Sequence, residues 1–329
     1  MIYGSIPGVG KPVSRIIFGA AHLKQRREAE DFRLCDAFFE GGGNAFDTAH
    51  VYGQGDSERT LGRWIRQRGL RERVVIVDKG AHPDVHSEGE RQRLDPNSID
   101  SDLVESLERL GTEYIDLFLL HRDDPQQDVA SILECLNEQV EKGRIRAFGV
   151  SNWSVPRLRE ANAYAQRRGL LPLAASSSHF SLAEQVRPPW PGSVTLTGAE
   201  RQEDRDWYTA QATSPQPMAL LCWSALAGGW LLRPADAPPP VGTHEEIATR
   251  AYESAPNRER RRRLVQLAEE RGRSVAQIAL AYVLSQPMAP FALISVATQE
   301  ECADNLAACE VSLSPKELEW LDLRRVGGG

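Results

Sequence analysis

No apolar run in this chain approaches the roughly 18 residues that a membrane-spanning helix needs. The first residues, Met1 to Ser5, lack the basic and apolar regions of a secretory signal, so we expect a cytoplasmic protein. An excess of positive charge is missing too, because 39 Lys and Arg face 46 Asp and Glu, a net charge of -7. The composition therefore offers no general attraction for nucleic acid or an anionic membrane, and we expect neither as a partner.

Cysteines are few, and none belongs to a Cys-x-x-Cys pair. The five of them are scattered, at Cys35, Cys135, Cys222, Cys302 and Cys309. A dispersed, odd set in a chain without an export signal favours reduced thiols with packing roles.

What the chain does have is a regular alternation of strand and helix patterns over 329 residues. Apolar runs predict eight strands, at Ile16–Gly19, Asn44–Thr48, Val74–Lys79, Ile115–His121, Ala147–Ser151, Leu173–Ser177, Ala219–Trp223 and Phe291–Val296. Amphipathic stretches between them predict helices at Glu28–Glu40, Glu58–Arg68, Ser98–Leu110, Val129–Lys142, Pro156–Arg168 and Arg258–Arg271. Nearly continuous apolar strands alternating with helices are typical of a covered parallel sheet. Eight repeats favour a closed (β/α)8 TIM barrel, and we expect residues 1–329 to form one barrel domain.

Turn residues agree with this pattern. Gly111 and Gly143 follow helix patterns and suit the left-handed residue that ends a helix, while Ser98 and Ser274 are placed as N-caps. The stretch from Tyr3 to Ser14, rich in Gly and Pro, predicts a small β-hairpin that closes one end of the barrel.

Two long segments interrupt the regular count, at residues 183–217 and 234–257. Each follows a predicted strand, so each should lie over the open end of the barrel. Long loops in compact domains are often functional lids, and aromatic residues within them, such as Trp190 and Tyr252, suit a cover for a ligand.

Four polar residues are placed at or just after strand ends: Asp47, Tyr52, Lys79 and His121. The C-terminal ends of barrel strands all open onto one mouth, which is where barrel enzymes have their active sites. We therefore expect these four side chains to meet there. A lysine beside a tyrosine stabilises the phenolate and lowers the tyrosine pKa, which suits a proton donor.

At these residues the chain resembles the aldo-keto reductase superfamily. Phe46-Asp47-Thr48-Ala49 with Tyr52-Gly53 is similar to the family's Asp-Thr-Ala…Tyr-Gly segment, and Lys142 to Asn152 is similar to its Gly-Lys-Ile-Arg…Gly-Val-Ser-Asn signature. The resemblance implies an NADPH-dependent barrel enzyme that reduces aldehydes and ketones. It also implies Tyr52 as general acid, Lys79 and Asp47 as its tuners and His121 as the residue that orients the carbonyl.

The resemblance further implies a set of residues that contact the nicotinamide cofactor. They are Gly19, Ser151, Asn152, Ser177, Trp223, Ser224, Leu226, Gly228, Thr298, Glu301 and Asn305. Ser151 and Asn152 would hold the carboxamide and Trp223 would stack on the ring.

This chain departs from the family's cofactor pattern at two important positions. Ser177 stands where relatives place a glutamine on the sixth strand, which weakens one carboxamide contact. Glu301 stands where some relatives have an arginine for the 2′-phosphate, and a carboxylate repels a phosphate. We therefore expect NADP(H) from the resemblance, with NAD(H) as a real alternative.

Histidines and aromatic residues near the strand ends suggest the substrate class. The predicted pocket comprises His22, His82, Arg122, Trp153, His179 and Trp230. Aromatic faces with polar groups between them suit a polar or sugar-like carbonyl compound, or the matching alcohol. The oligomeric state is not readable from the sequence.

Two other functions stay open at this point. Strand-end histidines and carboxylates are metal-ligand types, which allows a metal-dependent barrel hydrolase, although no His-x-His or His-Glu-x-x-His spacing appears. A non-catalytic module that binds the cofactor as a redox sensor is the second alternative. The basic run from Arg258 to Arg263 opens an amphipathic helix, and we interpret it as a solvated helix face.

Overall fold

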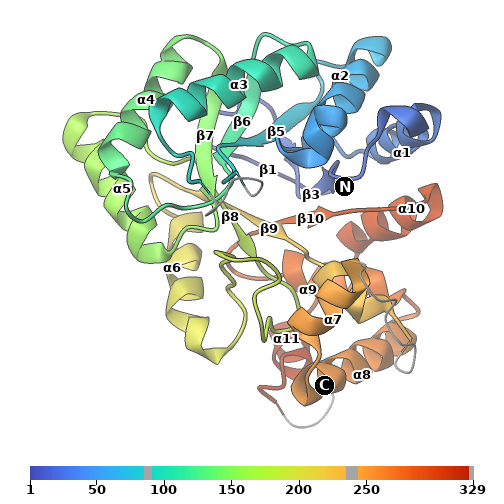
Figure 1. The fold of residues 1–329 in the computed structure, drawn as a ribbon. Helices are drawn as coiled ribbons and strands as arrows, with labels where there is room; N and C mark the ends of the chain where they lie inside the picture. Colours follow the sequence, from blue (N-terminus) through green and yellow to red (C-terminus); the bar gives the residue numbers. More distant parts are fainter. Residues whose placement is uncertain (85–90, 235–243, 326–329) are drawn as a thin grey trace.

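The computed structural model describes residues 1–84, 91–234 and 244–325, and at its centre is a closed barrel of eight parallel strands (Figure 1). The predicted fold class is confirmed. Around the barrel the strands follow the order β10, β3, β4, β5, β6, β7, β8, β9. Their bounds are β3 Ile16–Gly19, β4 Ala45–Asp47, β5 Val75–Gly80, β6 Ile115–Leu120, β7 Ile145–Ser151, β8 Ala175–His179, β9 Ala219–Trp223 and β10 Phe291–Ile294.

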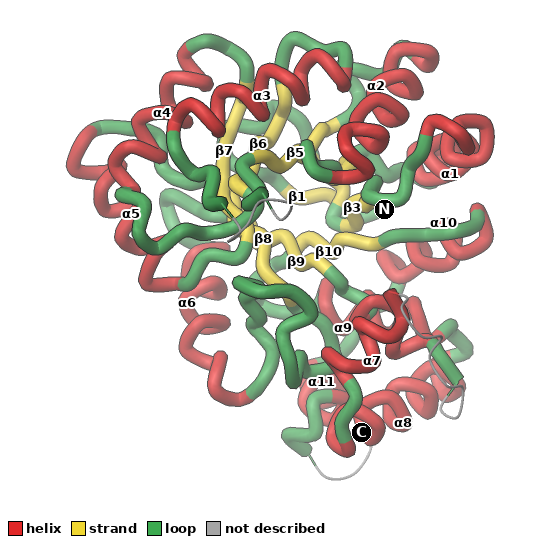
Figure 2. Tube along the Cα trace, viewed as in Figure 1, coloured by secondary structure: helices red, strands yellow, loops and turns green. Residues whose placement is uncertain are grey.

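Helices surround the strands, as Figure 2 shows with the strands in yellow inside a ring of red helices. They are α1 Glu28–Glu40, α2 Asp56–Arg68, α3 Pro96–Leu110, α4 Val129–Glu141, α5 Val155–Arg168, α6 Gln202–Ala212, α7 His244–Tyr252, α8 Ala255–Arg271, α9 Val275–Leu284, α10 Gln299–Ala307 and α11 Pro315–Leu321. Short 3-10 turns add η1 Gln25–Arg27, η2 Tyr52–Gly55, η3 Ala199–Arg201, η4 Ala227–Leu232 and η5 Ala308–Glu310.

The alternation of side chains along the strands produces two apolar cores. Ile16 and Phe18 of β3 belong to the larger core between barrel and helices, while Ile17 belongs to the smaller core inside the barrel. The interior core also contains Ile6 and Val9, which lie between β1 Tyr3–Gly4 and β2 Val13–Ser14 of the predicted hairpin. The hairpin therefore fills the barrel from its N-terminal end and leaves the opposite end for the site.

Six of the eight predicted strands differ from the observed strands by one or two residues at one or both ends, and the sixth strand is shifted by two residues at both ends. The sixth barrel strand runs from Ala175 to His179, not from Leu173 to Ser177. Parallel pairing aligns Ser177 with Ser151 of β7 and His179 with Trp223 of β9, so a polar run of serines continues the ladder. Burial and pairing with both neighbours outweigh the low strand preference of Ser-Ser-Ser-His.

The cap predictions held at Gly111 and Ser274 but failed at Ser98. Gly111 ends α3 with a φ of 63°, and Ser274 accepts a hydrogen bond from the backbone N–H of Gln277. The cap of α3 is Asp95, whose side chain accepts from the backbone N–H of Ser98. Pro96 is the first helical residue, a position where its missing N–H costs nothing.

The two long segments are not loops throughout. Residues 183–217 contain η3 and α6, and residues 234–257 contain α7, while residues 235–243 lie outside the described part of the chain. α6 and α7 were missed because their apolar faces are short and interrupted by polar residues.

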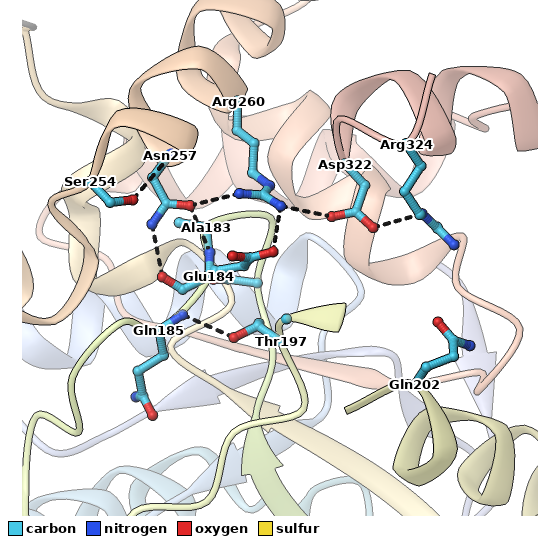
Figure 3. A network of polar contacts seen from close by, with 12 residues as sticks. Ala183, Glu184, Gln185, Thr197, Gln202, Ser254, Asn257, Arg260, Asp322 and Arg324 are labelled. Atoms are coloured by element: carbon cyan, nitrogen blue, oxygen red, sulfur yellow. Dashed lines mark hydrogen bonds and ion pairs between the residues drawn. The ribbon is translucent and has the colours of Figure 1, made fainter. Parts of the chain in front are cut away.

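The interpretation of Arg258–Arg263 as a solvated face was wrong for two of its residues. Arg260 and Arg261 are buried, at 4% and 9% exposure. Arg260 donates to Glu184 at 2.5 Å and Asn257 exchanges hydrogen bonds with the Glu184 backbone, which fixes the chain after β8 to α8 (Figure 3). Arg260 of this basic run therefore holds the chain after β8, at Glu184, against α8.

No helix in the described residues has the length and apolar character to cross a membrane.

Candidate active site

Asp47, Lys79 and Tyr52 meet at the C-terminal end of the barrel. Asp47 ends β4, Lys79 is the last residue but one of β5, and Tyr52 begins η2. Lys79 Nζ lies 2.6 Å from Asp47 Oδ1, 3.1 Å from the Thr48 carbonyl oxygen and 3.4 Å from the Tyr52 hydroxyl. A buried ammonium therefore joins a carboxylate to a phenol, in the arrangement that the strand ends predicted.

His121 follows β6 and completes the group. Its ring meets the Tyr52 ring edge-on, with centroids 5.6 Å apart, and the His82 ring at 4.7 Å. Burial, together with the Lys79 and Arg122 charges, lowers the pKa of His121 well below its usual value. His121 is therefore a neutral imidazole at physiological pH, able to donate one N–H to a ligand oxygen.

The acid–base properties of this group differ in one respect from expectation. Burial raises the pKa of Tyr52 above that of a free tyrosine, and the Lys79 charge only partly opposes this. Burial also raises the pKa of Asp47 against the pull of Lys79. For Lys79 itself, the opposing effect of burial is outweighed by Asp47 and Tyr52, so its pKa is raised. Tyr52 is thus a protonated phenol facing a permanent cation.

Ser151 and Asn152 lie at the end of β7, next to Ser177 of β8. The Ser151 hydroxyl donates to the Ser177 carbonyl at 3.1 Å and accepts from the Asn152 side-chain amide at 2.9 Å. The Asn152 side-chain oxygen accepts from the backbone N–H of Val194 at 3.1 Å. The Ser177 hydroxyl has no hydrogen-bond partner among the described residues. These polar groups suit a carboxamide.

Trp223 ends β9 and is contacted by rings on two sides. His179 lies 5.0 Å from it between centroids, and Trp190 lies 6.0 Å from it. The Trp223 indole N–H is buried without a hydrogen-bond partner in the described chain. A buried donor without a partner is costly, so this atom is a position where a bound polar group would stabilise the site.

The chain at 190–194 crosses the mouth, and we call it the mouth segment. Trp190 contacts Trp223 at one side, an ideal Cβ on Gly192 would lie 4.0 Å from Arg122 Cδ, and Val194 bonds to Asn152. The long segment after β8 therefore does lie over the open end of the barrel.

The remaining cofactor candidates lie at the end of β3, after β9 and on α10 with its N-cap. After Trp223 the backbone is left-handed at Ser224, Ala227 and Gly228, with φ of 52°, 54° and 60°, which turns the chain sharply around Leu226. Thr298 caps α10, and Asn305 is buried on the same helix. Gly19 ends β3 so close to β10 that a Cβ would meet the Ile294 carbonyl oxygen at 2.9 Å.

Glu301, which the resemblance implies as a cofactor contact, bonds to the backbone before α10. Its carboxylate accepts a hydrogen bond at 2.7 Å from the backbone N–H of Ala297, just before α10. The side chain therefore places a negative charge on a backbone donor near the N-terminus of α10, and such donors are common anion-binding groups.

The predicted substrate residues divide into two groups. His82 and Arg122 are half-buried beside His121. His22 follows the end of β3, and its Nε2 atom has no partner in the described chain. His179, Trp153 and Trp230 are instead buried in the protein.

The polar atoms of these three buried residues bond within the chain. Trp153 donates to the Arg122 carbonyl and Trp230 to Glu253, while His179 bonds to Thr195 and Tyr252. Their burial argues against the predicted contact with substrate.

Sequence reasoning missed the part that His179 plays. Its Nδ1 and Nε2 atoms lie 2.8 Å from the Thr195 hydroxyl and 3.0 Å from the Tyr252 hydroxyl, and burial lowers its pKa to about 3. This neutral histidine joins Thr195, just after the mouth segment, to Tyr252 at the end of α7. No local signal marks it, because its partners are distant in sequence. A metal centre is not supported: the described residues contain no group of three potential ligands.

Comparisons with known proteins agree with this geometry. Residues 15–323 match the profile of the "Aldo/keto reductase family". The chain is 29% identical over 331 residues to the "Uncharacterized oxidoreductase YrpG" of Bacillus subtilis, covering 98% of this chain and 95% of that protein. It is 26% identical to the "Aryl-alcohol dehydrogenase [NADP(+)]" of Phanerodontia chrysosporium, covering 96% and 83%. In fold it is similar to an aldo/keto reductase from Klebsiella pneumoniae solved with NADP and acetate, at a TM-score of 0.71 and 24% identity, covering 96% and 93%.

Proposed function

This chain belongs to the aldo/keto reductase family, and on that premise we propose that it reduces an aldehyde or ketone with NADPH, Tyr52 acting as the general acid. The observation that supports this role is the 3.4 Å approach of the Tyr52 hydroxyl to Lys79 Nζ, with Asp47 holding the ammonium at 2.6 Å. The metal-dependent and non-catalytic alternatives have no comparable support.

The residues derive their roles from charge and position. Bound reduced nicotinamide cofactor supplies the hydride to the carbonyl carbon. The carbonyl oxygen, which becomes negative as this happens, takes the proton of the Tyr52 hydroxyl, and Lys79 stabilises the phenolate that is left. The neutral imidazole of His121 donates a hydrogen bond to the same oxygen. Because burial raises the pKa of Tyr52 in the folded protein, its hydroxyl carries the proton before reaction at physiological pH.

The cofactor fits the polar groups at the ends of β7 and β8, where the Ser177 hydroxyl lacks a partner in the described chain. Ser151, Asn152 and Ser177 would hold the carboxamide, and the Trp223 side chain would pack on the ring. NADPH is favoured by the family and by a relative whose name specifies NADP(+). The Glu301 carboxylate works against a 2′-phosphate, so NADH stays a competing cofactor.

Two substrate classes follow from different residues. Arg122 and His82 favour the polar or sugar-like carbonyl that the sequence predicts. A flat aryl carbonyl is the second candidate, favoured by Trp190, which is 40% exposed and lies over Trp223, and by the named aryl-alcohol relative.

The first test is a fluorescence titration of the purified protein with NADPH and, separately, with NADH. We expect saturable binding of NADPH. Turnover is then followed by loss of reduced cofactor with a sugar aldehyde, an aryl aldehyde and a bulky aliphatic ketone of matched reactivity. Turnover of the bulky aliphatic ketone alone would contradict both substrate classes, and failure to bind either cofactor would contradict the function.

A further inference from the structure

We propose that Arg109 is a positioning residue that holds the segment carrying Tyr52 against α3, and so sets the distance between Tyr52 and Lys79. The inference rests on the proposed function, because it assigns Arg109 a role in the same reaction. Arg109 does not touch the phenol, and it acts through the backbone on either side of it.

The segment after Tyr52 has a backbone that needs support. Gly53, Gln54 and Gly55 all have positive φ, at 55°, 54° and 85°. Consecutive left-handed residues are sparsely populated in free chains, and Gln54 lacks the freedom of glycine. Such a conformation persists when surrounding contacts determine it.

Arg109 supplies contacts on both sides of Tyr52. Its Nη1 atom donates to the His50 carbonyl oxygen at 3.0 Å, two residues before the tyrosine. Beyond the tyrosine, the guanidinium lies against Gly55, where a Cβ would come within 2.7 Å of Arg109 Nε and 2.8 Å of Cζ. Because Gly55 has no side chain, the guanidinium can occupy this space. The Arg109 side chain therefore contacts the chain both before Tyr52, at His50, and after it, at Gly55.

Carboxylates fix the guanidinium in this place. Nη1 also donates to Glu58 Oε2 at 3.0 Å, and Glu58 on α2 is fully buried. On the outer side Nη2 donates to Glu105 at 2.7 Å, one turn earlier on α3. A planar guanidinium with donors in a fixed fork can serve three acceptors at once, which a lysine ammonium on a flexible stem does less well.

Small movements of this turn matter because the Tyr52–Lys79 contact is already long. Lys79 is fixed in β5 by Asp47 and by the Thr48 carbonyl, whereas the hydroxyl at 3.4 Å depends on where η2 begins. A displacement of about 1 Å at a reacting group is enough to reduce a rate on the order of a hundredfold. Loss of the Arg109 contacts would also change the stabilisation that Lys79 gives the phenolate.

The test compares Arg109→Lys with a matched control, Arg66→Lys. Arg66 on α2 likewise donates to a backbone carbonyl, that of Leu110, and lies against a left-handed glycine, Gly111, but it does not contact the Tyr52 segment. We expect Arg109→Lys to lower kcat about tenfold or more. NADPH affinity and KM should stay within about twofold, and the pH profile of kcat should move. We expect Arg66→Lys to leave all four quantities as in wild type.

Glu105→Gln covers the case in which Arg109→Lys fails to fold. Glu105 is about half exposed, so this variant keeps the fold, and it loosens the outer side of the guanidinium. We expect kcat to fall roughly two- to fivefold, with the same shift of the pH profile. Wild-type kcat and pH profile in Glu105→Gln and in any folded Arg109→Lys would overturn the proposal.

Equal losses in Arg109→Lys and Arg66→Lys, matched by lower melting temperatures, would overturn it as well, since they would indicate a merely structural role. The proposed function is tested separately by the wild-type protein. If wild type binds NADPH and reduces a carbonyl while Arg109→Lys does the same equally well, only the positioning role fails.

Discussion

The two sides of the barrel mouth differ in how far their polar side chains bond to one another. On the side of β4, β5 and β6, the polar side chains contact one another, with Lys79 bonded to Asp47 and in reach of Tyr52. On the side of β8, β9 and β10, the Ser177 hydroxyl and the Trp223 indole N–H have no partners among the described residues. Direct contacts thus join the residues of the reaction side, although Asp47 Oδ2 and His121 Nδ1 also have no partners in the described chain, and on both sides a ligand could satisfy the remaining polar atoms. Substitutions on the two sides should therefore separate chemistry from binding.

The largest effect should come from Tyr52→Phe, which removes the proton donor and leaves the cofactor side untouched. We expect kcat to fall by about 10²- to 10⁴-fold, with NADPH affinity nearly unchanged in a fluorescence titration. Tyr3→Phe, at an exposed tyrosine that bonds to the Gly42 carbonyl, is the control and should keep full activity. Substantial activity in Tyr52→Phe would remove this residue from the acid role and break the contrast between the two sides.

The second effect concerns acid stability, and His179 is its source. Burial lowers the pKa of His179 to about 3 from an ordinary value of 6.5. Between these values the unfolded chain binds a proton that the folded protein excludes, so falling pH favours unfolding and rising pH restores stability. The dependence amounts to about 1.4 kcal/mol per pH unit at most.

Urea unfolding of wild type and His179→Gln at pH 6.5, 5.5 and 4.5 measures this dependence. The glutamine amide can bond to Thr195 and Tyr252 but does not titrate. We expect the variant to lose stability less steeply as the pH falls. Parallel slopes for the two proteins would show that His179 does not contribute to the loss of folding stability in acid.

The third effect is on cofactor choice, through Glu301. Glu301→Arg replaces the carboxylate that occupies the Ala297 N–H by a cation, so we expect NADPH to bind about tenfold more tightly, as a new charge-assisted hydrogen bond allows. NADH affinity should not change. Glu300→Arg adds the same charge next to it and keeps the Glu301–Ala297 bond, so it should gain less. A gain for NADH equal to that for NADPH would rule out a 2′-phosphate effect.

The sequence predicted the barrel well because strand and helix periods are local. The bounds of α1, β3 and β9 agree with prediction residue by residue. The reaction side was predictable for a related reason, since Asp47, Lys79 and His121 each close an apolar run and Tyr52 follows one. β8 was misplaced because its pairing partners, not its own residues, determine where it ends.

The contacts that fix the chain around and after β8 were less predictable. Burial of Arg260 depends on Glu184 and Asp322, which only the folded chain brings together (Figure 3). The role of His179 likewise depends on Thr195 and Tyr252. A run of charged residues or a single histidine in the sequence does not indicate which distant residues it will contact. Physical reasoning from one sequence therefore identifies residues at strand ends better than it identifies their neighbours.

The closure of the barrel through β10 and β3 has a consequence for how this chain is made. β3 begins near the start of the chain, yet its outer neighbour is β10, and Arg15 bonds to the Pro290 carbonyl across 275 residues. During synthesis β3 keeps an unpaired edge until almost the whole chain has emerged, and open strand edges promote aggregation. Shortened chains that stop before residue 291 should therefore be poorly soluble, and chaperones that shield strand edges should matter most late in translation.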